Sequence, residues 1–457
     1  MIRILSAFLA LPLVLFFLFS SETQAVNITV TTTDDVISPV DGLCSLREAV
    51  LSANNDPLAL VPLGECPNGA GIDEITFDAA LNGTPIELSI AGAGEDAVLT
   101  GDLDITSAIS FTGNGVENTI IDGNSIDRVF HIIGGSTTVS MAQMTITGGL
   151  LNDDEGAGIS NGGDLLLDTV TVHTNVVTGT TSAAIGGGVF NSDTLDVIRT
   201  TIDNNSAERG SGIFSNNILT IMQSTISNNM GRAGGGITNF GIATMFNSTV
   251  SNNTGTGNSA GIDNSTGGTF DILNSTIVEN VAPDLGGGGI ASNAPGDLTL
   301  ANSIVANNPG GDCFGGSNVI SFGNNLDSDD TCNLDTLLGD IPNVDPMIMA
   351  LSDNGGPTLT HALMNGSPAV ETGNNAGCPA QDQRDTVRPQ DGDDDGVPVC
   401  DIGALEMLLA ELIAQANQGS GGGGCSIAPA NADTMAFPLY LLIPALILIR
   451  RLRRSLK

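Results

Sequence analysis

Residues 224–253 read STISNNMGRAGGGITNFGIATMFNSTVSNN, and this stretch contains the pattern that decides the fold. It begins and ends with one element, Ser-Thr-Ile/Val-Ser-Asn-Asn, and carries a second element, Gly-Gly-Gly-Ile-Thr-Asn, between the two copies. Related copies of the first element start at residues 200 and 275, and related copies of the second at residues 156, 186, 210, 259 and 287. The two elements alternate, so the middle of the chain is a repeat.

Each period of this repeat holds three short segments with strand character. A third apolar patch, such as LTI at residues 219–221, completes the period, and no stretch has helical spacing. Glycine, asparagine and serine separate the segments, as expected of turns. The apolar anchors of the second element recur every 24 to 30 residues, at Ile159, Val189, Ile213, Ile237, Ile262 and Ile290.

We therefore predict an all-β fold, a right-handed parallel β-helix with three short strands per rung. Inward Ile, Val, Leu and Phe would stack into a continuous core. Asparagine and glycine would occupy the corners because they tolerate left-handed backbone, and stacked asparagines would hydrogen-bond along the axis. Leucine-rich and ankyrin repeats are excluded because the period lacks a helix. A β-propeller, whose repeats run to about 40 residues, is the alternative.

The ends of a solenoid need caps, and the sequence changes character near both ends. Residues 41–56, DGLCSLREAVLSANND, predict a short amphipathic helix. Ser45 would be its N-cap and Glu48 would complete a capping box, while Leu46, Ala49, Val50 and Ala53 would face the first rung.

Residues 1–25 have the pattern of a secretory signal: one early cation, an apolar run over residues 4–19, and a small-residue segment that ends at Ala25. An uncleaved membrane anchor is the alternative, although the run is shorter than the roughly 20 residues of a typical span. We therefore expect the rest of the chain to lie outside the cytoplasm.

Six of the seven cysteines form three sequence-local couples, and Cys425 is left over. Six thiols allow fifteen pairings, among which the sequence alone does not choose. Local pairing is the simplest expectation in an oxidising compartment. The candidate couples are Cys44 with Cys66, Cys313 with Cys332, and Cys378 with Cys400.

The formal net charge is -38, and the stretch between Ala25 and Cys425 has seven arginines and no lysine. Such a surface excludes nucleic acid and anionic lipid as partners, because both need cations to neutralise phosphates. Cations, calcium above all, are the natural counter-ions of such a surface. The alternative is that the acidic residues only keep the protein soluble.

The sharpest chemical candidate is a calcium loop. Asp391, Asp393 and Asp395, followed by Gly396, fit the Asp-x-Asp-x-Asp-Gly start of such a loop. The glutamate expected at position twelve is replaced by Ile402. Bound Ca²⁺ would stiffen the region that the Cys378 and Cys400 couple encloses, and an acidic surface loop is the alternative.

Signals of catalysis are weak. The exported body has no lysine, tryptophan or tyrosine, and the Gly-His-Gly and Arg-x-Lys elements of polygalacturonases are absent. We interpret His131, His173 and His361 as isolated structural residues, and Arg199, Arg209 and Arg232 as solvated or paired with acids. A non-enzymatic surface protein for adhesion, surface structure or recognition is favoured, with a polysaccharide-active enzyme as the alternative. A flat face covered by Asn, Ser and Thr would favour the non-enzymatic surface protein. A groove with Asp, Arg and His clustered across rungs would favour the enzyme.

Three parts of the chain resemble known families of surface proteins, among them bacterial and archaeal ones. Residues 44–49, CSLREA, reproduce the motif after which the CSLREA proteins are named. The resemblance to these proteins covers roughly residues 27–80. Residues 353–406, from DNGGPTLTHALMNG to VCDIGALE, resemble the choice-of-anchor Q domain, and the glycine-rich rungs resemble the GGAI-type repeats of polymorphic outer-membrane proteins. The resemblance implies an exported, anchored β-helix and no established activity.

The C-terminal tail is similar to GlyGly-CTERM sorting signals. A glycine stalk with QGSGGGGCS is followed by the apolar run FPLYLLIPALILI and the basic end RRLRRSLK. The resemblance implies cleavage near Gly424 and Cys425 by sorting machinery and modification of the new cysteine end. The basic end would stay cytoplasmic, and a simple C-terminal anchor is the alternative. The predicted division is 1–25 signal, 26–125 N-terminal cap and first coils, 126–310 repeat body, 311–406 C-terminal coils and cap, 407–424 linker and 425–457 sorting signal.

Overall fold

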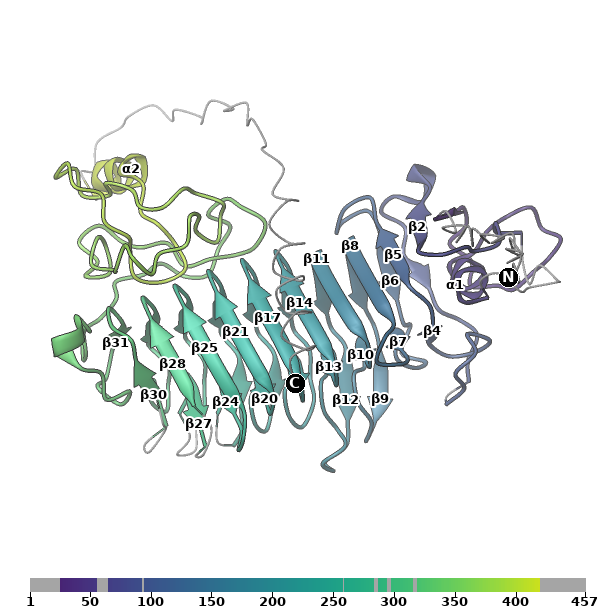
Figure 1. Ribbon diagram of the computed structural model, residues 1–457, viewed down its shortest axis with the longest axis horizontal. Helices are drawn as coiled ribbons and strands as arrows, with labels where there is room; N and C mark the ends of the chain where they lie inside the picture. Colours follow the sequence, from purple (N-terminus) through teal and green to yellow (C-terminus); the bar gives the residue numbers. More distant parts are fainter. Residues whose placement is uncertain are drawn as a thin grey trace, which may run out of the picture. The chain divides into compact units, whose positions relative to one another are not determined.

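The computed structural model describes residues 25–55, 65–92, 94–257, 259–282, 287–293, 297–314 and 319–419. In these residues the strands coil into a right-handed parallel β-helix, which confirms the predicted fold class (Figure 1). The predicted signal before Ala25, the Gly424 and Cys425 site and the basic end lie outside the described residues. Two compact units divide the chain after Gln415, and residues 416–419 are the described part of the second.

The described strands form two large sheets and two small ones, with successive rungs paired in parallel. The eight-stranded sheet, here the short sheet, contains β4 (Leu103–Ile105), β7 (Phe130–Ile132), β10 (Ile159–Asn161), β13 (Val189–Asn191), β16 (Ile213–Ser215), β20 (Ile237–Asn239), β24 (Ile262–Asn264) and β27 (Ile290–Ser292).

The 19-stranded sheet bends at a corner, and so presents two faces. Before the corner lie β1 (Asn27–Val30), β2 (Asp73–Phe77), β5 (Ile109–Thr112), β14 (Thr194–Ile198), β17 (Ile218–Met222), β21 (Ile242–Phe246), β25 (Thr269–Leu273), β28 (Leu298–Ala301) and β30 (Val319–Ser321). After it lie β3 (Ile86–Glu87), β6 (Ile120–Asp122), β15 (Thr201–Asp203), β18 (Thr225–Ser227), β22 (Thr249–Ser251), β26 (Thr276–Val278), β29 (Ile304–Ala306) and β31 (Leu326–Asp327). Strands β8 (Thr138–Thr147) and β11 (Asp164–His173) pass through the corner. The small sheets pair β9 (Leu150–Asn152) with β12 (Val176–Thr178) and β19 (Met230–Gly231) with β23 (Thr254–Gly255).

The core runs through the lumen of the coil. Within one rung, Ile213, Leu219, Ile221 and Ile226 point inward and are almost completely buried. Each pairs in register with an apolar residue of the next rung, so identical positions stack along the axis. The alternation of apolar and polar residues in the repeat is therefore the period of two of a strand with one buried face.

The corners have the predicted left-handed backbone. Asn247 and Asn252 have φ values of 47° and 56°, and Gly234 has a φ of 56°. Equivalent positions in other rungs repeat these values. The Gly-x-Gly element begins at such corners, because a side chain at its first glycine would meet backbone of the same turn, 2.7 Å from the carbonyl oxygen of Ile237 in the case of Gly234.

Buried polar side chains connect the rungs along the axis. The last asparagine of the first element accepts, through Oδ1, the backbone N–H and the Nδ2 of its counterpart one rung earlier. The stacked asparagines predicted from the repeat are thus confirmed, and a parallel row of serines is linked in the same way through N–H to Oγ bonds. The asparagine ladder contains Asn175, Asn205, Asn229, Asn253, Asn280 and Asn308.

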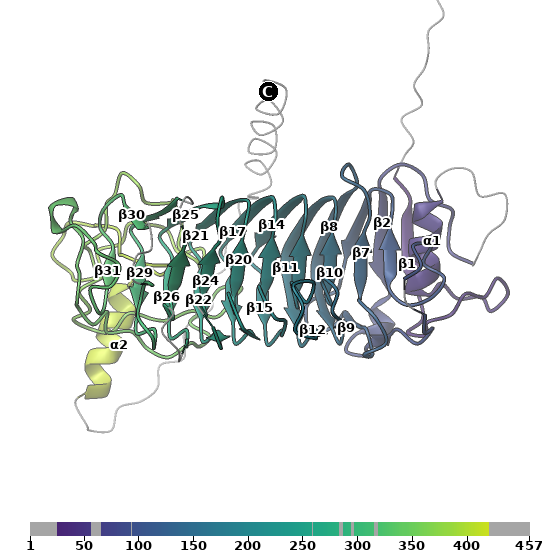
Figure 2. The ribbon, with the colours of Figure 1, turned by 90° about the horizontal axis from the view of Figure 1, so that it is seen from below.

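The predicted N-terminal helix is α1 (Leu46–Asn54), which packs against β1, β2 and β4 at the first rungs (Figure 2). Ser45 and Glu48 form the predicted capping box. Arg47 is completely buried, binds Asp35 at 2.6 Å and donates to the backbone carbonyls of residues 98, 101 and 102. Ser45, Arg47 and Glu48 therefore build the cap.

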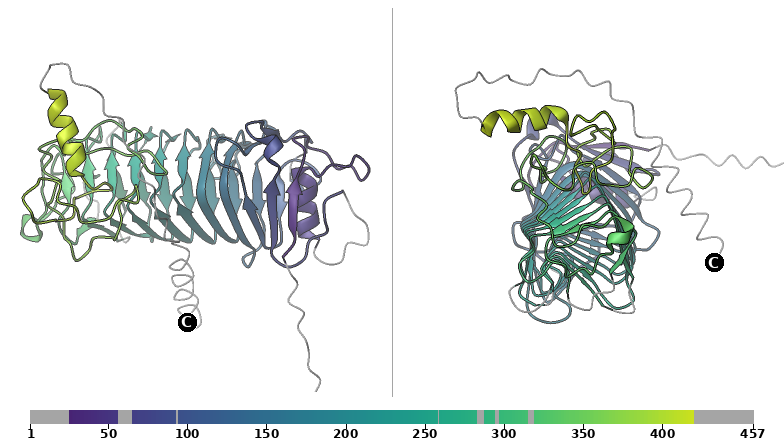
Figure 3. Two further views of the ribbon diagram at one scale, coloured as in Figure 1. Left: turned by 90° about the horizontal axis from the view of Figure 1, so that it is seen from above. Right: turned by 90° about the vertical axis from the view of Figure 1, so that its left-hand side faces the viewer.

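Residues 345–407, here the C-terminal cover, lie along the side of the solenoid on the face formed by β18, β22 and β26 (Figures 1 and 3). Thr225 donates to the carbonyl of Leu359 at 2.6 Å, and Thr249 donates to Gln383 at 2.7 Å. The outward threonines of the first repeat element thus hold the cover.

The region predicted as a linker starts with a helix, α2 (Leu409–Gly419). Gln415 accepts from the N–H of Asn365 and donates to the carbonyl of Leu363, which fastens the helix to the C-terminal cover. The described helices also include two short 3-10 turns, η1 (Ala79–Leu81) and η2 (Thr336–Leu338). Within the described residues, every helix falls short of the length and apolarity needed to cross a membrane.

Candidate functional sites

The outward side of β14, β17, β21, β25 and β28, here the open face, carries a regular polar row. One outward polar residue of each strand pairs in register with an outward polar residue of the next. Strand spacing places these side chains about 4.8 Å apart. All are half-buried except Asp271, which is exposed, and the row contains Asp196, Thr220, Thr244, Asp271 and Thr299.

A pocket of about 260 Å³ opens near the N-terminal end of the β-helix. We call it the acidic pocket, because five carboxylates line it beside Arg128 and His131. These residues come from successive rungs and from the loop before β4. The carboxylates are those of Glu95, Asp96, Asp102, Asp127 and Asp154.

Two buried contacts organise the acidic pocket. Arg128 donates to Asp102 at 3.0 Å and also to backbone carbonyls of the next rung. Burial raises the pKa of Asp102 to about 7; the charge of Asp104 acts in the same direction and the charge of Arg128 in the opposite one. His131 Nδ1 lies 3.2 Å from Asp104 Oδ1 and 3.7 Å from Asp96 Oδ1.

The histidines are not isolated, which corrects the interpretation from the sequence. His131 belongs to the carboxylate cluster just described, and His173 Nδ1 lies 3.0 Å from a threonine hydroxyl. His361 is buried: its Nδ1 donates to the carbonyl of Met349 at 2.7 Å, and its Nε2 accepts from the hydroxyl of Ser251 at 2.8 Å. This pair is enclosed beneath the C-terminal cover, so it serves structure.

The arginines of successive rungs behave largely as expected. Arg199 pairs with Asp168 at 2.6 Å, and Arg232 pairs with Glu208 one rung away. Arg209 instead lies over two phenylalanine rings, 5.2 and 5.6 Å from their centroids. These contacts make the three arginines structural and do not align them as a row of catalytic cations.

The predicted calcium-loop residues come together. One carboxylate oxygen each of Asp391, Asp393 and Asp395 lies within 4.8 Å of the others and of a Glu371 oxygen. Glu371 accepts the N–H of Asp393 at 3.4 Å, and burial, with the charges of Asp393 and Asp391, raises its pKa. Sequence reasoning missed Glu371 because it precedes the loop by 20 residues and belongs to no local motif.

Asp401, which is adjacent to loop position twelve, does not join this cluster. Its Oδ1 accepts the backbone N–H of Glu371 at 2.7 Å, and its side chain is buried. Burial and the nearby Glu406 charge raise its pKa to about 8. Asp401 thus positions the segment that carries Glu371.

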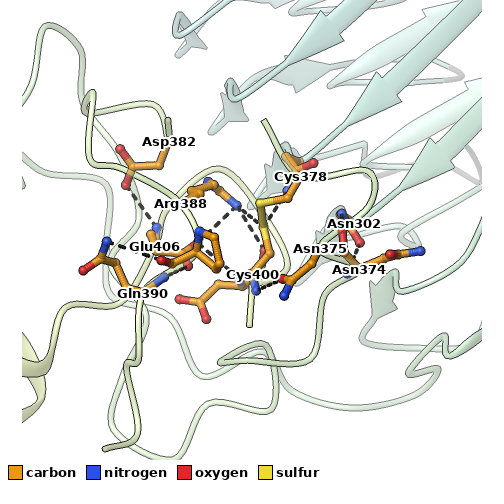
Figure 4. The surroundings of a disulfide bond; sticks show 12 residues. Asn302, Asn374, Asn375, Cys378, Asp382, Arg388, Gln390, Cys400 and Glu406 are labelled. Atoms are coloured by element: carbon orange, nitrogen blue, oxygen red, sulfur yellow. Dashed lines mark hydrogen bonds and ion pairs between the residues drawn. A yellow bond between two sulfur atoms is a disulfide. The ribbon is translucent and has the colours of Figure 1, made fainter. Parts of the chain in front are cut away.

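The three local disulfides predicted from the sequence are formed: Cys44–Cys66, Cys313–Cys332 and Cys378–Cys400. Figure 4 shows the surroundings of the last. Arg388 and Glu406 form a fully buried ion pair at 3.4 Å beside it, and Arg388 donates to the carbonyl of Gly403 at 2.8 Å. This centre fixes the chain on both sides of the acidic loop.

The comparisons with known proteins identify no family for this chain. No family model matches the chain, and no curated protein matches its sequence. Among solved structures, the crystal structure of pectate lyase Pel9A matches with a TM-score of 0.44 and 12% identity. The match covers 85% of this chain and 98% of the lyase.

Proposed function

We propose that this chain is an exported protein held at the cell surface, where its β-helix is a rigid scaffold for adhesion, surface structure or recognition. Three disulfides agree with an oxidising compartment outside the cytoplasm. The signal pattern of residues 1–25, the tail after residue 407 and the resemblance to CSLREA and choice-of-anchor Q proteins support export, sorting and membrane attachment.

The open face is the observation that carries the proposal. Its row carries one hydroxyl or carboxylate per rung, at a constant interval of about 4.8 Å, and neighbouring members can bond to one another, as Thr299 does when it donates to Asp271 at 2.7 Å. An extended ligand with repeated hydroxyl groups could contact several rungs at once, so individually weak hydrogen bonds would add up. Because the exported body lacks tryptophan and tyrosine, such recognition would rest on polar contacts.

A double variant of the open face tests this proposal. Thr244→Val with Thr299→Val removes two hydroxyls, one of which donates to Asp271, and keeps β-branched side chains of equal size. Loss of two hydrogen bonds should weaken binding to an array of neutral and acidic polysaccharides about tenfold or more. Thr180→Val, an exposed position after β12, is the control. Binding by the double variant equal to that of the wild type would overturn the role of the open face.

A calcium ion at the acidic loop is a further part of the proposal. Glu371, Asp391, Asp393 and Asp395 offer only oxygen ligands, which Ca²⁺ prefers in sets of six to eight with backbone carbonyls and water. The ion would neutralise four clustered carboxylates and tie the Glu371 segment to the loop inside the Cys378–Cys400 disulfide.

A polysaccharide-active enzyme is the second candidate, and the acidic pocket favours it. Asp102, Arg128 and His131 from neighbouring rungs line one pocket, which supplies an acid, a cation and an imidazole. Turnover of polysaccharides by the purified protein, lost in Asp102→Asn but retained in Asp391→Asn, would replace the scaffold proposal. Circular dichroism would show that both variants fold, and no turnover on a broad panel would count against the enzyme.

A further inference from the structure

The Asp96, Asp104 and His131 side chains converge, and two of them, Asp96 and His131, also line the acidic pocket. Asp104 and His131 are the central residues of β4 and β7, which pair directly in register. Because Leu103 and Ile105 point into the lumen, the side chain of Asp104 points outward, toward the imidazole of the next rung. Asp96 belongs to the loop before β4 and is exposed.

The spacing of the three atoms suits a metal ion. His131 Nδ1 is 3.2 Å from Asp104 Oδ1 and 3.7 Å from Asp96 Oδ1, and all three atoms lie within 4.8 Å of one another. Ligands at about 2.0–2.2 Å from a tetrahedral zinc ion are about 3.3–3.6 Å apart. The distance of 3.7 Å from His131 Nδ1 to Asp96 Oδ1 is slightly longer than this spacing, and the exposed Asp96 side chain can move to shorten it.

The most buried ligand is already oriented. Asp104 is completely buried, and its second oxygen accepts the N–H of Val98 at 3.1 Å, which leaves Oδ1 directed at His131. The carbonyl of Val98 in turn accepts from the buried Arg47 at 3.0 Å. This support from a second layer of contacts is what holds ligands in metal sites.

The geometry points to a divalent transition-metal site formed by His131, Asp104 and Asp96, with its open side toward the acidic pocket. One imidazole and two carboxylates suit zinc or manganese, whereas calcium takes oxygen ligands only. Three protein ligands leave a coordination position for water or a ligand in the pocket. The ion would also fasten the loop of Asp96 to the first rungs, and the site depends on neither candidate function.

Titration of the full protein with zinc chloride alone tests this site. We expect saturable binding of one ion by calorimetry and a rise in melting temperature. Cobalt chloride should give a visible absorption band of a bound ion. Loss of a second-layer contact typically weakens metal binding about 10–100-fold, so His131→Gln should weaken it at least about 100-fold. Asp96→Asn should weaken it less. We expect both variants to fold, because the His131 side chain is 28% exposed and the Asp96 side chain 73% exposed.

Two control variants separate this site from general binding to an acidic surface. His173→Gln removes a histidine on another face, and Asp393→Asn alters the C-terminal acidic loop. Both should bind zinc as the wild type does. No saturable binding by the wild type, or equal binding by His131→Gln and the wild type, would overturn the proposal. A calcium effect that survives His131→Gln belongs to the C-terminal loop and leaves this result unambiguous.

Discussion

Asp312 accepts both the backbone N–H and the Nδ2 of Asn308, at 3.1 and 3.0 Å, and so ends the asparagine ladder. In the rungs before Asn308, the backbone N–H of each ladder asparagine donates to the Oδ1 of the equivalent asparagine in the next rung. Asp312 Oδ2 accepts the N–H and hydroxyl of Ser328, both at 2.7 Å. One carboxylate thus takes four donors, which an amide side chain with a single oxygen cannot do.

Asp312→Asn should therefore destabilise the C-terminal rungs, although it preserves the size of the side chain. An Nδ2 group would face two donors of Ser328 and leave buried groups unsatisfied, at a cost of about 1–3 kcal/mol. Chemical denaturation measures this cost. Asn217→Ala, an exposed asparagine outside the ladder, is the control and should change the free energy of unfolding by less than about 0.5 kcal/mol. Equal stability of Asp312→Asn and the wild type would contradict the role of the carboxylate.

Gln383 is the central contact between the solenoid and the C-terminal cover. It is completely buried, accepts from Thr249 at 2.7 Å and donates to Thr225 and Thr358, both at 2.9 Å. Gln383→Glu replaces the donating amide by a buried carboxylate, which we expect to cost about 2 kcal/mol or more.

Hydrogen exchange measured by mass spectrometry should show faster exchange in residues 345–407 of Gln383→Glu, while the rungs before β18 keep their protection. Gln390→Glu is the matched control, because the Gln390 side chain donates at the edge of the cover, to Val387. Uniform loss of protection along the whole solenoid would mean that the cover and the rungs unfold as one unit.

The repeat predicted most of the rung structure because its period equals one turn of the coil. Residues with the same role, such as Asn229 and Asn253, recur at the same position of the motif, so ladder, corners and core follow from spacing alone. Local disulfides were predictable for a similar reason, because Cys44 and Cys66 are only 22 residues apart.

The candidate sites were less predictable because they join segments without shared spacing. His131 lies 27 residues from Asp104, in early rungs that lack the Gly-x-Gly element, so their register was not visible in the sequence. The C-terminal cover reaches Thr249 from a distance of 134 residues through irregular backbone. Such docking depends on side-chain complementarity and leaves no periodic signal.

The His361–Ser251 contact predicts a dependence of stability on pH. Burial lowers the pKa of His361 below its usual value of 6.5, although the bond to Met349 and the charge of Glu279 act against this. Between the lowered pKa and 6.5, the unfolded chain binds a proton that the folded chain does not. The stabilising contribution of neutral His361 is therefore present above about pH 6.5 and lost as the pH falls below it.

Comparison with His361→Gln isolates this effect from the many carboxylates. The stability of the wild type relative to this variant should fall between pH 7 and pH 5, as measured by denaturation at each pH. Asn217→Ala, which removes no titratable group and lies outside the cover, should give a curve parallel to that of the wild type. A constant difference between wild type and His361→Gln over this range would show that His361 does not titrate differently on folding.

Calcium should raise the melting temperature by stabilising the acidic loop beside the Cys378–Cys400 disulfide. A free calcium concentration of 100 times the Kd adds about 2.7 kcal/mol to the stability of the folded state, and a melting curve resolves a change of this size easily. Asp393→Asn and Glu371→Gln should each reduce the shift, because both remove a carboxylate from the cluster. The Glu371 variant is the sharper test, since this residue lies outside the loop motif. Glu117→Gln, an exposed acid far from the cluster in sequence, should retain the full shift. A shift of equal size in all variants would assign the calcium effect to the general acidity of the surface.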